Sequence, residues 1–365
     1  MKSPDPKTLP RTVRVAILVV ALYLFLLSIS LLGDAFKGLG TGFAHTLISL
    51  TANPIAGVFV GILATSILQS SSCTTSLVVG LVASGTLAMP NAISIIMGAN
   101  IGTTVTGLLV SFMHVTRRQE FERAFPAAVV HDSFNLLTVL VLLPVEIMFH
   151  PLARISAGLT GLFAGAGGFT FASPLKLATT PVAALVDSLV GNQPVVLLVL
   201  AIILLFVSLK FVVDMMRSLV SRRMSLVVDK YLFGSAIRAF LLGLVFTAIV
   251  QSSSATISIV VPMAGAGLLT VRQIFPYAVG ANIGTTVTAI LAALVTGTPA
   301  GIQLALAHLS FNVLGAAVWS PFRIVPIWFA EWWGGFCARH RVWALVYVIV
   351  LFFVIPLTVT ILSRR

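Results

Sequence analysis

The tetrapeptide Gln-Ser-Ser-Ser occurs twice in the chain, at 69–72 and at 251–254, each time inside a long apolar run. Its hydroxyl and carboxamide groups supply hydrogen-bond donors and acceptors without net charge. At a break between two helices they would be joined by the free N–H groups that open the second helix, and helix N-termini bind oxyanions. The same hydroxyls, together with unwound backbone carbonyls, coordinate hard cations such as sodium. The two copies therefore predict a site for a tetrahedral anion, a sodium ion or both.

A second motif, Gly-Ala-Asn-Ile-Gly-Thr-Thr-Val-Thr, also occurs twice, at 98–106 and at 280–288. Its glycines permit either the unwinding of a helix or the close approach of two helices, and its asparagine and threonines add an amide and hydroxyls. Neither motif contains Lys or Arg. An anion would thus be held by dipoles and hydroxyls, with sodium supplying the positive charge. This predicts a strict dependence on that cation.

The composition is that of a polytopic membrane protein. Of the 365 residues, 58% are hydrophobic and 9% are charged, whereas about a quarter of the residues in a soluble domain are charged. Apolar runs long enough to span a bilayer occur at 12–32, 127–149, 193–213 and 342–362. The net charge of +12 does not indicate a nucleic-acid partner, because the basic residues gather in short loops and at the chain ends, as the positive-inside bias predicts.

The two motifs belong to an internal repeat. Residues 61–109 align without a gap on 243–291, with a constant offset of 182 and identity at 23 of 49 positions. The segment His-x-x-Phe-Asn follows in both copies, at 131–135 and 308–312. The predicted organisation is a first repeat over 12–149, an external connector over 150–192, a second repeat over 193–320, and a C-terminal segment over 321–365 with an extra transmembrane helix.

The distribution of basic residues predicts the orientation. The N-terminus, the loop at 117–123 and the loop at 217–238 are basic, so we expect them on the cytoplasmic side. The first QSSS hairpin then enters from outside and the second from inside, which is the inverted topology of secondary transporters. The predicted fold is an all-α polytopic membrane protein with two inverted-topology repeats, each with a broken-helix or re-entrant hairpin that carries QSSS. The predicted location is the cell membrane, with the N-terminus in the cytoplasm.

Several other residues carry weaker signals. Asp132 is a carboxylate near the start of a predicted span, which makes it a functional candidate, with a surface role near the cytoplasmic loop as the alternative. His131 and His308 have no metal-ligand partner nearby in the sequence, so we expect caps or local hydrogen bonds from them. The two cysteines are far apart and form no metal-binding spacing. The Trp-rich piece at 319–336 is expected to be interfacial or re-entrant.

The sequence resembles the type II sodium-dependent phosphate cotransporters in both motifs and in two longer stretches, FERAFPAAVVHDSFNLLTVLVLLPVE at 121–146 and QIFPYAVGANIGTTVTAILAAL at 273–294. The resemblance covers most of 50–320. It implies sodium-driven uptake of inorganic phosphate by alternating access, with the substrate between the two QSSS hairpins. The connector is short and free of cysteine, unlike the disulfide-bonded outer loop of animal members, which favours a bacterial-type protein.

The resemblance also implies which residues bind the substrates. Those that match the phosphate-binding motif are Gln69, Ser70, Ser71, Ser72, Gln251, Ser252, Ser253 and Ser254. The candidates for sodium are Thr74, Thr75, Asn100, Thr103, Thr104, Asn282, Thr285, Thr286 and Asp132. Asp132 matches an aspartate of electrogenic members, so an additional sodium ion and net charge movement are expected. The expected partners are phosphate, sodium and the lipid bilayer, with no cofactor beyond sodium as the coupling ion. The oligomeric state is not predicted.

Three other functions are compatible with parts of the sequence. The same fold could carry another oxyanion, such as sulfate or a carboxylate, and the motifs alone do not separate these from phosphate. An intramembrane serine hydrolase would need one activated serine with a positioned base, and two inverted copies of a nucleophile argue against it. A passive channel would not need coupled cation sites. The prediction is therefore a transporter and not an enzyme.

Overall fold

The computed structural model describes residues 10–39, 53–165, 174–219 and 233–363, and within these ranges it contains helices and no strands. Seven of the described helical segments are long and apolar enough to cross a membrane: α1 (Arg11–Gly38), α5 (Met89–Ser111) with the short helix η2 (Phe112–His114), α6 (Arg118–Phe149), α9 (Pro194–Leu219), α13 (Val271–Thr296), α14 (Pro299–Trp319) and the final segment Arg341–Leu362. The prediction of an all-α polytopic membrane protein is confirmed, and the four apolar runs lie in α1, α6, α9 and the final segment, apart from Gln193, which precedes α9.

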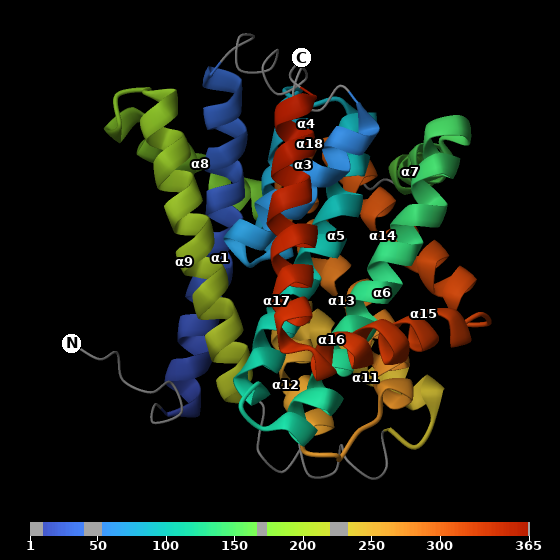
Figure 1. The fold of residues 1–365 in the computed structure, drawn as a ribbon. Helices are drawn as coiled ribbons and strands as arrows, with labels where there is room; N and C mark the ends of the chain where they lie inside the picture. The colour runs from blue at the N-terminus through green and yellow to red at the C-terminus, as the bar shows by residue number, and fades with distance from the viewer. Residues whose placement is uncertain (1–9, 40–52, 166–173, 220–232, 364–365) are drawn as a thin grey trace.

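Four shorter apolar helices form two consecutive pairs. They are α3 (Pro54–Leu68), α4 (Ser71–Ala83), α11 (Ala236–Val250) and α12 (Ser253–Gly265). Each pair is separated by the first residues of a QSSS segment. Figure 1 shows α3 and α4 toward the upper end of the molecule, and α11 and α12 toward the lower end. The two QSSS segments are therefore approached from opposite ends.

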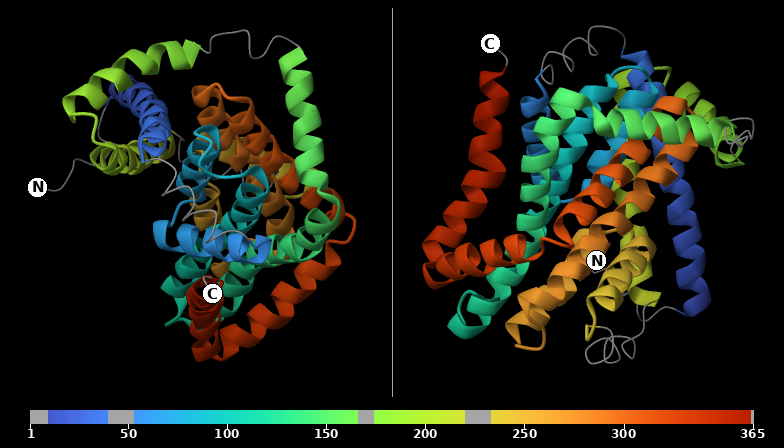
Figure 2. Two further views of the ribbon diagram at one scale, coloured as in Figure 1. Left: turned by 90° about the horizontal axis from the view of Figure 1, so that it is seen from above. Right: turned by 90° about the vertical axis from the view of Figure 1, so that its right-hand side faces the viewer.

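Helices α1 and α9 lie side by side at one edge of the bundle (Figures 1 and 2). They bury a small apolar cluster between them, in which Leu18 and Ala21 of α1 meet Val212 and Met215 of α9. Figure 1 shows α1 starting at the lower end, whereas α9 starts at the upper end after α8. These two helices are related by the 182-residue offset, and they run in opposite directions.

The first GANIGTTVT segment lies within the continuous helix α5, which crosses α3 at very short range. A Cβ atom placed on Gly98 would stand 1.8 Å from the carbonyl oxygen of Val58. A Cβ atom on Gly61 would stand 2.0 Å from the carbonyl oxygen of Ile95. Both distances are far inside van der Waals contact, so only glycine fits at this crossing. Of the two roles considered for the glycines, the structure shows close approach and not unwinding.

The second repeat makes the same crossing between α11 and α13. A Cβ atom on Gly243 would stand 2.1 Å from the carbonyl oxygen of Tyr277, and one on Gly280 would stand 2.0 Å from that of Phe240. These four positions are the first crossing shifted by 182 residues. The repeat in the sequence thus has a matching repeat in helix packing.

Replacing Gly98 by alanine is expected to lower the free energy of unfolding by about 3 kcal/mol or more, because a methyl group must force α3 and α5 apart. The matched control is Gly33→Ala in α1, where an added Cβ meets nothing within 4 Å. That change should be neutral or slightly stabilising, because alanine is the better helix former. Thermal unfolding in detergent, followed by tryptophan fluorescence, compares the two. Equal transition temperatures would contradict the close crossing.

The connector between the repeats contains two further helices, α7 (Pro151–Gly165) and α8 (Pro174–Leu189). The corner between α6 and α7 is fixed by Glu146, whose carboxylate accepts hydrogen bonds from the backbone N–H groups of Leu152 (2.6 Å) and Ala153 (3.2 Å). A carboxylate at a helix N-terminus complements the free N–H groups and the helix dipole. Figure 2 shows α7 extending sideways from the bundle.

After α14 the chain forms a C-terminal arm over residues 324–362. Its parts are α15 (Ile324–Phe329), η4 (Ala330–Gly334), α16 (Gly335–Arg339), α17 (Arg341–Ile349), η5 (Val350–Val354) and α18 (Ile355–Leu362), of which η4 and η5 are π-helical. The run from α15 to α16 lies crosswise to the bundle, and the rest of the arm is upright (Figure 1). The arm contacts α6, where the Ser133 hydroxyl donates to the carbonyl oxygen of Pro326 at 2.9 Å.

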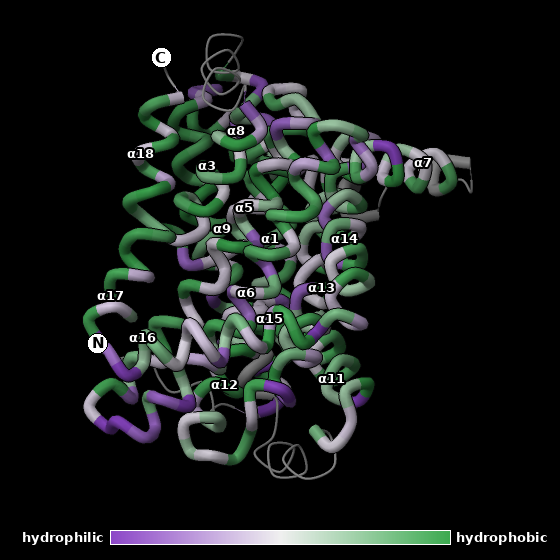
Figure 3. Tube along the Cα trace, turned by 45° about the vertical axis from the view of Figure 1, so that its right-hand side comes forward, coloured by the Kyte–Doolittle hydropathy of each residue, from purple (hydrophilic) through white to green (hydrophobic). Residues whose placement is uncertain are grey.

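Aromatic side chains of the arm face outward. The rings of Trp328 and Trp332 are stacked with centroids 5.5 Å apart, and both side chains are exposed. Tryptophan is enriched at the boundary between bilayer and water. Figure 3 shows that hydrophilic residues gather at the lower end beside α16, and that hydrophobic residues predominate along the upright α18. The crosswise run favours the interfacial alternative for the Trp-rich segment over the re-entrant one.

Candidate functional site

Both QSSS segments break their helices in the same way. Helix α3 ends at Leu68 and α11 ends at Val250, and the next residue is glutamine in both cases. Gln69 has a φ of 53° and Gln251 a φ of 56°, so each lies in the left-handed region. That conformation is uncommon for residues other than glycine and is concentrated at functional sites. Each glutamine is therefore the point at which the chain turns from one helix into the next.

The first serine of each segment caps the second helix. The Ser70 hydroxyl oxygen accepts a hydrogen bond from the N–H of Cys73 at 3.2 Å, and the Ser252 hydroxyl oxygen accepts one from the N–H of Ala255 at 3.1 Å. The last two serines of each segment already belong to α4 or α12. The N-terminal turns of both helices, with their free N–H groups and positive dipole ends, thus open directly at the breaks.

The two arms of each break are joined by a pair of threonines. The hydroxyls of Thr65 and Thr74 lie 3.0 Å apart, and those of Thr247 and Thr256 lie 2.9 Å apart. All four residues are buried, and the second pair is the first shifted by 182 positions. These hydrogen bonds hold the helix that enters each break against the helix that leaves it.

The two breaks contact each other although 179 residues separate them in the sequence. The Ser72 hydroxyl donates to the carbonyl oxygen of Gln251 at 2.9 Å, and its oxygen lies 3.5 Å from the hydroxyl oxygen of Thr288. In the other direction, the Ser254 hydroxyl donates to the carbonyl oxygen of Thr103 at 3.4 Å. Each QSSS segment therefore reaches either the other QSSS segment or the other repeat's GANIGTTVT helix.

The two glutamine side chains differ in their surroundings. Gln69 is exposed, and its Oε1 accepts from the Thr106 hydroxyl at 3.1 Å while its Nε2 donates to the carbonyl oxygen of Ser66 at 2.5 Å. Gln251 is buried, and its Oε1 has no hydrogen-bond partner among the described residues. The second break thus presents an amide oxygen that the protein leaves unpaired.

Several other buried oxygens on these helices also lack a hydrogen-bond partner within the described ranges. They are the hydroxyls of Ser66, Ser76, Ser253 and Thr285. A buried polar group without a partner costs about 1–3 kcal/mol, and native proteins keep few of them. Their concentration on the helices that carry the two motifs provides oxygen ligands for an ion, or hydroxyl donors for an anion.

Asp132 is fully buried in α6, which rules out the surface alternative. Its Oδ1 accepts a hydrogen bond from the Thr104 hydroxyl at 2.7 Å, and its Oδ2 accepts one from the Tyr347 hydroxyl. Both donors are neutral, and the four ion pairs formed by the described residues do not include Asp132. A buried carboxylate without a cationic partner is costly, so this position favours a bound cation.

Asn282 of the second repeat bridges two residues of the first. Its Oδ1 lies 2.7 Å from Nε2 of His131, and its Nδ2 donates to Oδ1 of Asn135 at 2.7 Å. All three residues are buried. The expectation of local hydrogen bonds for His131 is wrong: its partner is 151 residues away, on α13.

The corresponding residues in the other half do not repeat this arrangement. Asn100 donates to the carbonyl oxygen of Ile96 in its own helix at 2.8 Å. Nδ1 of His308 and Oδ1 of Asn312 are buried and have no hydrogen-bond partner in the part of the chain that the structure describes. The two halves share these residues but differ in their hydrogen bonds, so the structure is asymmetric at this point.

The remaining predicted residues have local contacts. The Thr286 hydroxyl donates to the carbonyl oxygen of Ile283, and the Thr103 hydroxyl donates to that of Ala99. Thr75 is buried in α4. The structure thus brings together, at the contact between the repeats, Ser72, Gln251, Ser254 and Thr103. Thr104 of α5, the next residue in the chain, bonds to Asp132 of α6. Thr286 and Asn100 instead bond within their own helices.

Sequence reasoning missed two residues of this region. Thr288 contacts the tip of the first break, and the 182-residue offset from Thr106 marks it in the sequence. Tyr347 lies in the C-terminal arm, 215 residues from Asp132, and the arm has no counterpart in the first repeat. For Tyr347 no signal in the sequence indicates the contact.

The fold and the site define a class of protein, namely an α-helical membrane protein with two matching broken helices that meet inside it. The sequence matches the Na+/Pi-cotransporter family over residues 24–168 and 204–326. The chain belongs to this family, and the resemblance noted from the motifs is confirmed.

Two characterised proteins with similar sequences agree with this family assignment. Sodium-dependent phosphate transport protein 2B from Homo sapiens is 32% identical over 445 residues, which covers 95% of this chain and 64% of that protein. Sodium-dependent phosphate transport protein 2A from Mus musculus is 32% identical over 426 residues, which covers 95% of this chain and 67% of that protein. The chain spans about two thirds of the length of these relatives. No solved structure matches it.

Proposed function

We propose that the protein is a sodium-coupled symporter of inorganic phosphate. The observation that carries this proposal is the contact between the two QSSS breaks, in which Ser72 donates to the carbonyl oxygen of Gln251. Membership of the Na+/Pi-cotransporter family and the names of the relatives support the choice of sodium and phosphate. The relatives are named as transport proteins, which supports a transporter over a hydrolase.

The geometry suggests how the substrates bind. Helices α4 and α12 begin at the two breaks, so a phosphate between them would receive backbone N–H groups and serine hydroxyls from both. The motifs offer no cationic side chain. Sodium, held by oxygens such as Oε1 of Gln251 and Oγ1 of Thr285, would supply the missing positive charge. Phosphate and sodium then stabilise each other in the site, and this mutual dependence is the basis of coupling.

We further propose that the chain consists of two inverted repeats and works by alternating access. The opposite directions of α1 and α9 support this, as do the opposite ends from which the two broken helices approach. In an inverted pair, the two repeats exchange their conformations when the site changes sides. The bridge made by Asn282, and the missing bridge at Asn100, fit one of two such end states.

The proposed orientation places the N-terminus in the cytoplasm and the protein in the cell membrane. Figure 1 shows the start of α1 and the start of α6 at the same end as α11, α12 and α15. These segments carry Arg11, Arg14, Arg117, Arg118, Arg123, Arg238 and Arg323. Basic residues are retained on the cytoplasmic side of membrane proteins, so this end faces inward.

Uptake of labelled phosphate into proteoliposomes tests the function. A sodium gradient is expected to drive accumulation of phosphate, and an equal potassium gradient is not. Sulfate and succinate in excess should leave the uptake of phosphate unchanged. Uptake that persists without sodium would overturn the symport proposal, and full competition by sulfate or succinate would identify a different anion as the substrate.

A further inference from the structure

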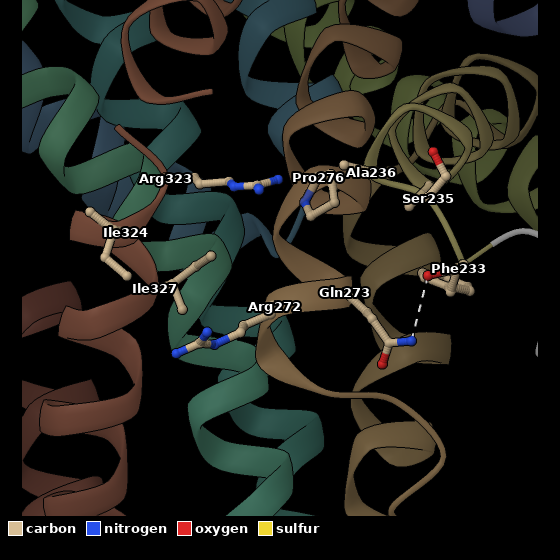
Figure 4. Close-up of a pocket in the computed structure, with 11 residues that line it drawn as sticks. Phe233, Ser235, Ala236, Arg272, Gln273, Pro276, Arg323, Ile324 and Ile327 are labelled. Atoms are coloured by element: carbon tan, nitrogen blue, oxygen red, sulfur yellow. Dashed lines mark hydrogen bonds between the residues drawn. The ribbon is translucent and has the colours of Figure 1, made fainter. Parts of the chain in front are cut away.

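A cavity of about 350 Å³ lies at the arginine-rich end of the molecule, away from the two breaks. Figure 4 shows its lining: the start of α11 on one side, the first turns of α13 in the middle, and the start of α15 on the other. The polar lining residues are Ser235, Arg272, Gln273 and Arg323, and the apolar ones include Pro276, Ile324 and Ile327. Nothing in the proposed transport mechanism uses this cavity.

The cavity is positively charged. The Nε atom of Arg272 lies 3.4 Å from Oε1 of Glu331, and the side chains of both residues are exposed to solvent. Arg323 is exposed and forms no ion pair with the described residues. The lining of the cavity therefore carries two guanidinium groups, and only that of Arg272 is paired with a carboxylate among the described residues. Figure 4 shows both arginine side chains between the ribbons of α13 and α15. Guanidinium groups bind phosphate oxygens in a bidentate manner, so the excess charge favours a phosphate group.

Helix α11 adds hydrogen-bond donors to the same space. Ser235 is the residue before its first turn, and its side chain makes no capping hydrogen bond. The hydroxyl of Ser235 and the free N–H groups that follow thus remain available at the wall of the cavity. This helix N-terminus adds hydrogen-bond donors to a cavity whose charge comes from Arg272 and Arg323.

A second cavity, of about 370 Å³, adjoins the first and is apolar. The two share the lining residues Ala236, Pro276 and Arg323. The rest of the second lining includes Ile237, Phe240, Phe275, Val279, Ala316 and Ala317. The combined space is therefore cationic at one end and apolar at the other, with Arg323 at the junction. A free phosphate ion would fill only the first part.

The surroundings indicate where the occupant comes from. Ile237, Phe322 and Ile324 border these cavities or lie next to them, and their exposed fractions are 71%, 61% and 60%. Large exposed apolar side chains next to a span face lipid in a membrane protein. The cavities thus open toward the bilayer, at the end of the protein where the arginines gather.

We propose that the two cavities together bind one acidic glycerophospholipid from the cytoplasmic leaflet. Its phosphate lies between Arg323 and Arg272, near Ser235, and one acyl chain follows the apolar cavity along α11, α13 and α14. Basic pockets between helices on the cytoplasmic side are suited to anionic head groups. A lipid in this position joins the start of the second broken helix to the start of the C-terminal arm, and so stabilises their packing.

Delipidated protein in a neutral detergent tests the site. Adding phosphatidylglycerol should raise the Tm by roughly 5 °C at a large excess over Kd. Phosphatidylcholine and inorganic phosphate should each leave the Tm unchanged. The double variant Arg272→Gln/Arg323→Gln should lose the response to phosphatidylglycerol. The matched control is Arg154→Gln, an exposed arginine in α7, which should keep the full response.

Two further results separate a lipid site from a simple anion site and from a general effect of added lipid. Ala317→Trp fills the apolar cavity without changing its charge. It should raise the phosphatidylglycerol concentration that gives a half-maximal rise in Tm by roughly tenfold or more, about 1.4 kcal/mol of binding. A response to inorganic phosphate as large as that to phosphatidylglycerol would overturn the proposal in favour of a simple anion site. An equal response of the double variant, or an equal response to phosphatidylcholine, would overturn it in favour of a general lipid effect. None of these readouts depends on transport, so they stand apart from the symport test.

Discussion

Gln251→Ala is expected to abolish sodium-driven phosphate uptake while leaving the protein folded. The substitution removes the amide whose Oε1 is buried and unpaired, but it keeps the backbone carbonyl that accepts from Ser72. Removing an unpaired buried polar group costs no protein hydrogen bond, so the stability loss should stay within about 1 kcal/mol. If the amide binds a charged substrate, its loss costs about 1.5–3 kcal/mol of binding, which is roughly 10- to 100-fold.

Two further variants test the backbone conformation at Gln251 and the contribution of the first break. Gln251→Gly also removes the amide, but it relieves the left-handed conformation at φ 56°, so it should be at least as stable as the alanine variant and equally inactive. Gln69→Ala should also abolish uptake, because both breaks contribute to one site. Uptake is measured in proteoliposomes and folding by size-exclusion chromatography. Wild-type uptake by either alanine variant would contradict the shared site.

The local part of this structure was predictable from the sequence. A polar tetrapeptide inside an apolar run predicts a break, and its repetition at a fixed offset predicts a second break of the same form. Both breaks depend on contacts between residues that are close in the sequence, because Ser70 and Ser252 cap the helices that they precede. The glycines at 61 and 98 recur at 243 and 280, and the packing recurs with them. A repeated sequence therefore reproduces those contacts that lie within one repeat.

Contacts between different parts of the chain were not predictable in this way. Asn100 and Asn282 occupy the same position of the same motif, but only Asn282 bridges two residues of the other repeat. Identical side chains have different partners because the two halves pack asymmetrically. The bond from Tyr347 to Asp132 is a second case, since it joins the repeat to an arm that has no internal copy. Neither periodicity nor charge distribution carries information about such pairs.

Asp132→Gly is expected to remove the current that accompanies phosphate uptake while some uptake remains. The family resemblance implies that this buried carboxylate binds an additional sodium ion, and we propose that it does, so its removal takes one positive charge from each cycle. Asp132→Asn should have the same effect, because it keeps the shape and can still accept from Thr104, but carries no charge. Current and labelled uptake are recorded on the same proteoliposome preparation. An unchanged ratio of charge to phosphate would contradict this role for Asp132.

Tyr347→Phe tests whether the C-terminal arm positions that carboxylate. The phenyl ring keeps the edge contact with Trp333 at 5.9 Å, and only the hydroxyl that donates to Oδ2 of Asp132 is lost. A hydrogen bond worth about 1 kcal/mol corresponds to roughly a fivefold rise in the sodium concentration for half-maximal current. Tyr23→Phe is the control, because its hydroxyl donates to the carbonyl oxygen of Ala178, far along the chain from this site.

The decisive comparison is Tyr347→Phe in the Asp132→Asn background, measured as phosphate uptake against sodium concentration. If the tyrosine acts only by orienting the carboxylate, its hydroxyl has no further effect once the charge is gone, and the two changes are strongly non-additive. A purely structural role for the arm predicts the opposite, with the same loss in both backgrounds. An additive result would therefore reassign Tyr347 to packing, and a non-additive one would make the arm part of the sodium site, although no repeat in the sequence connects them.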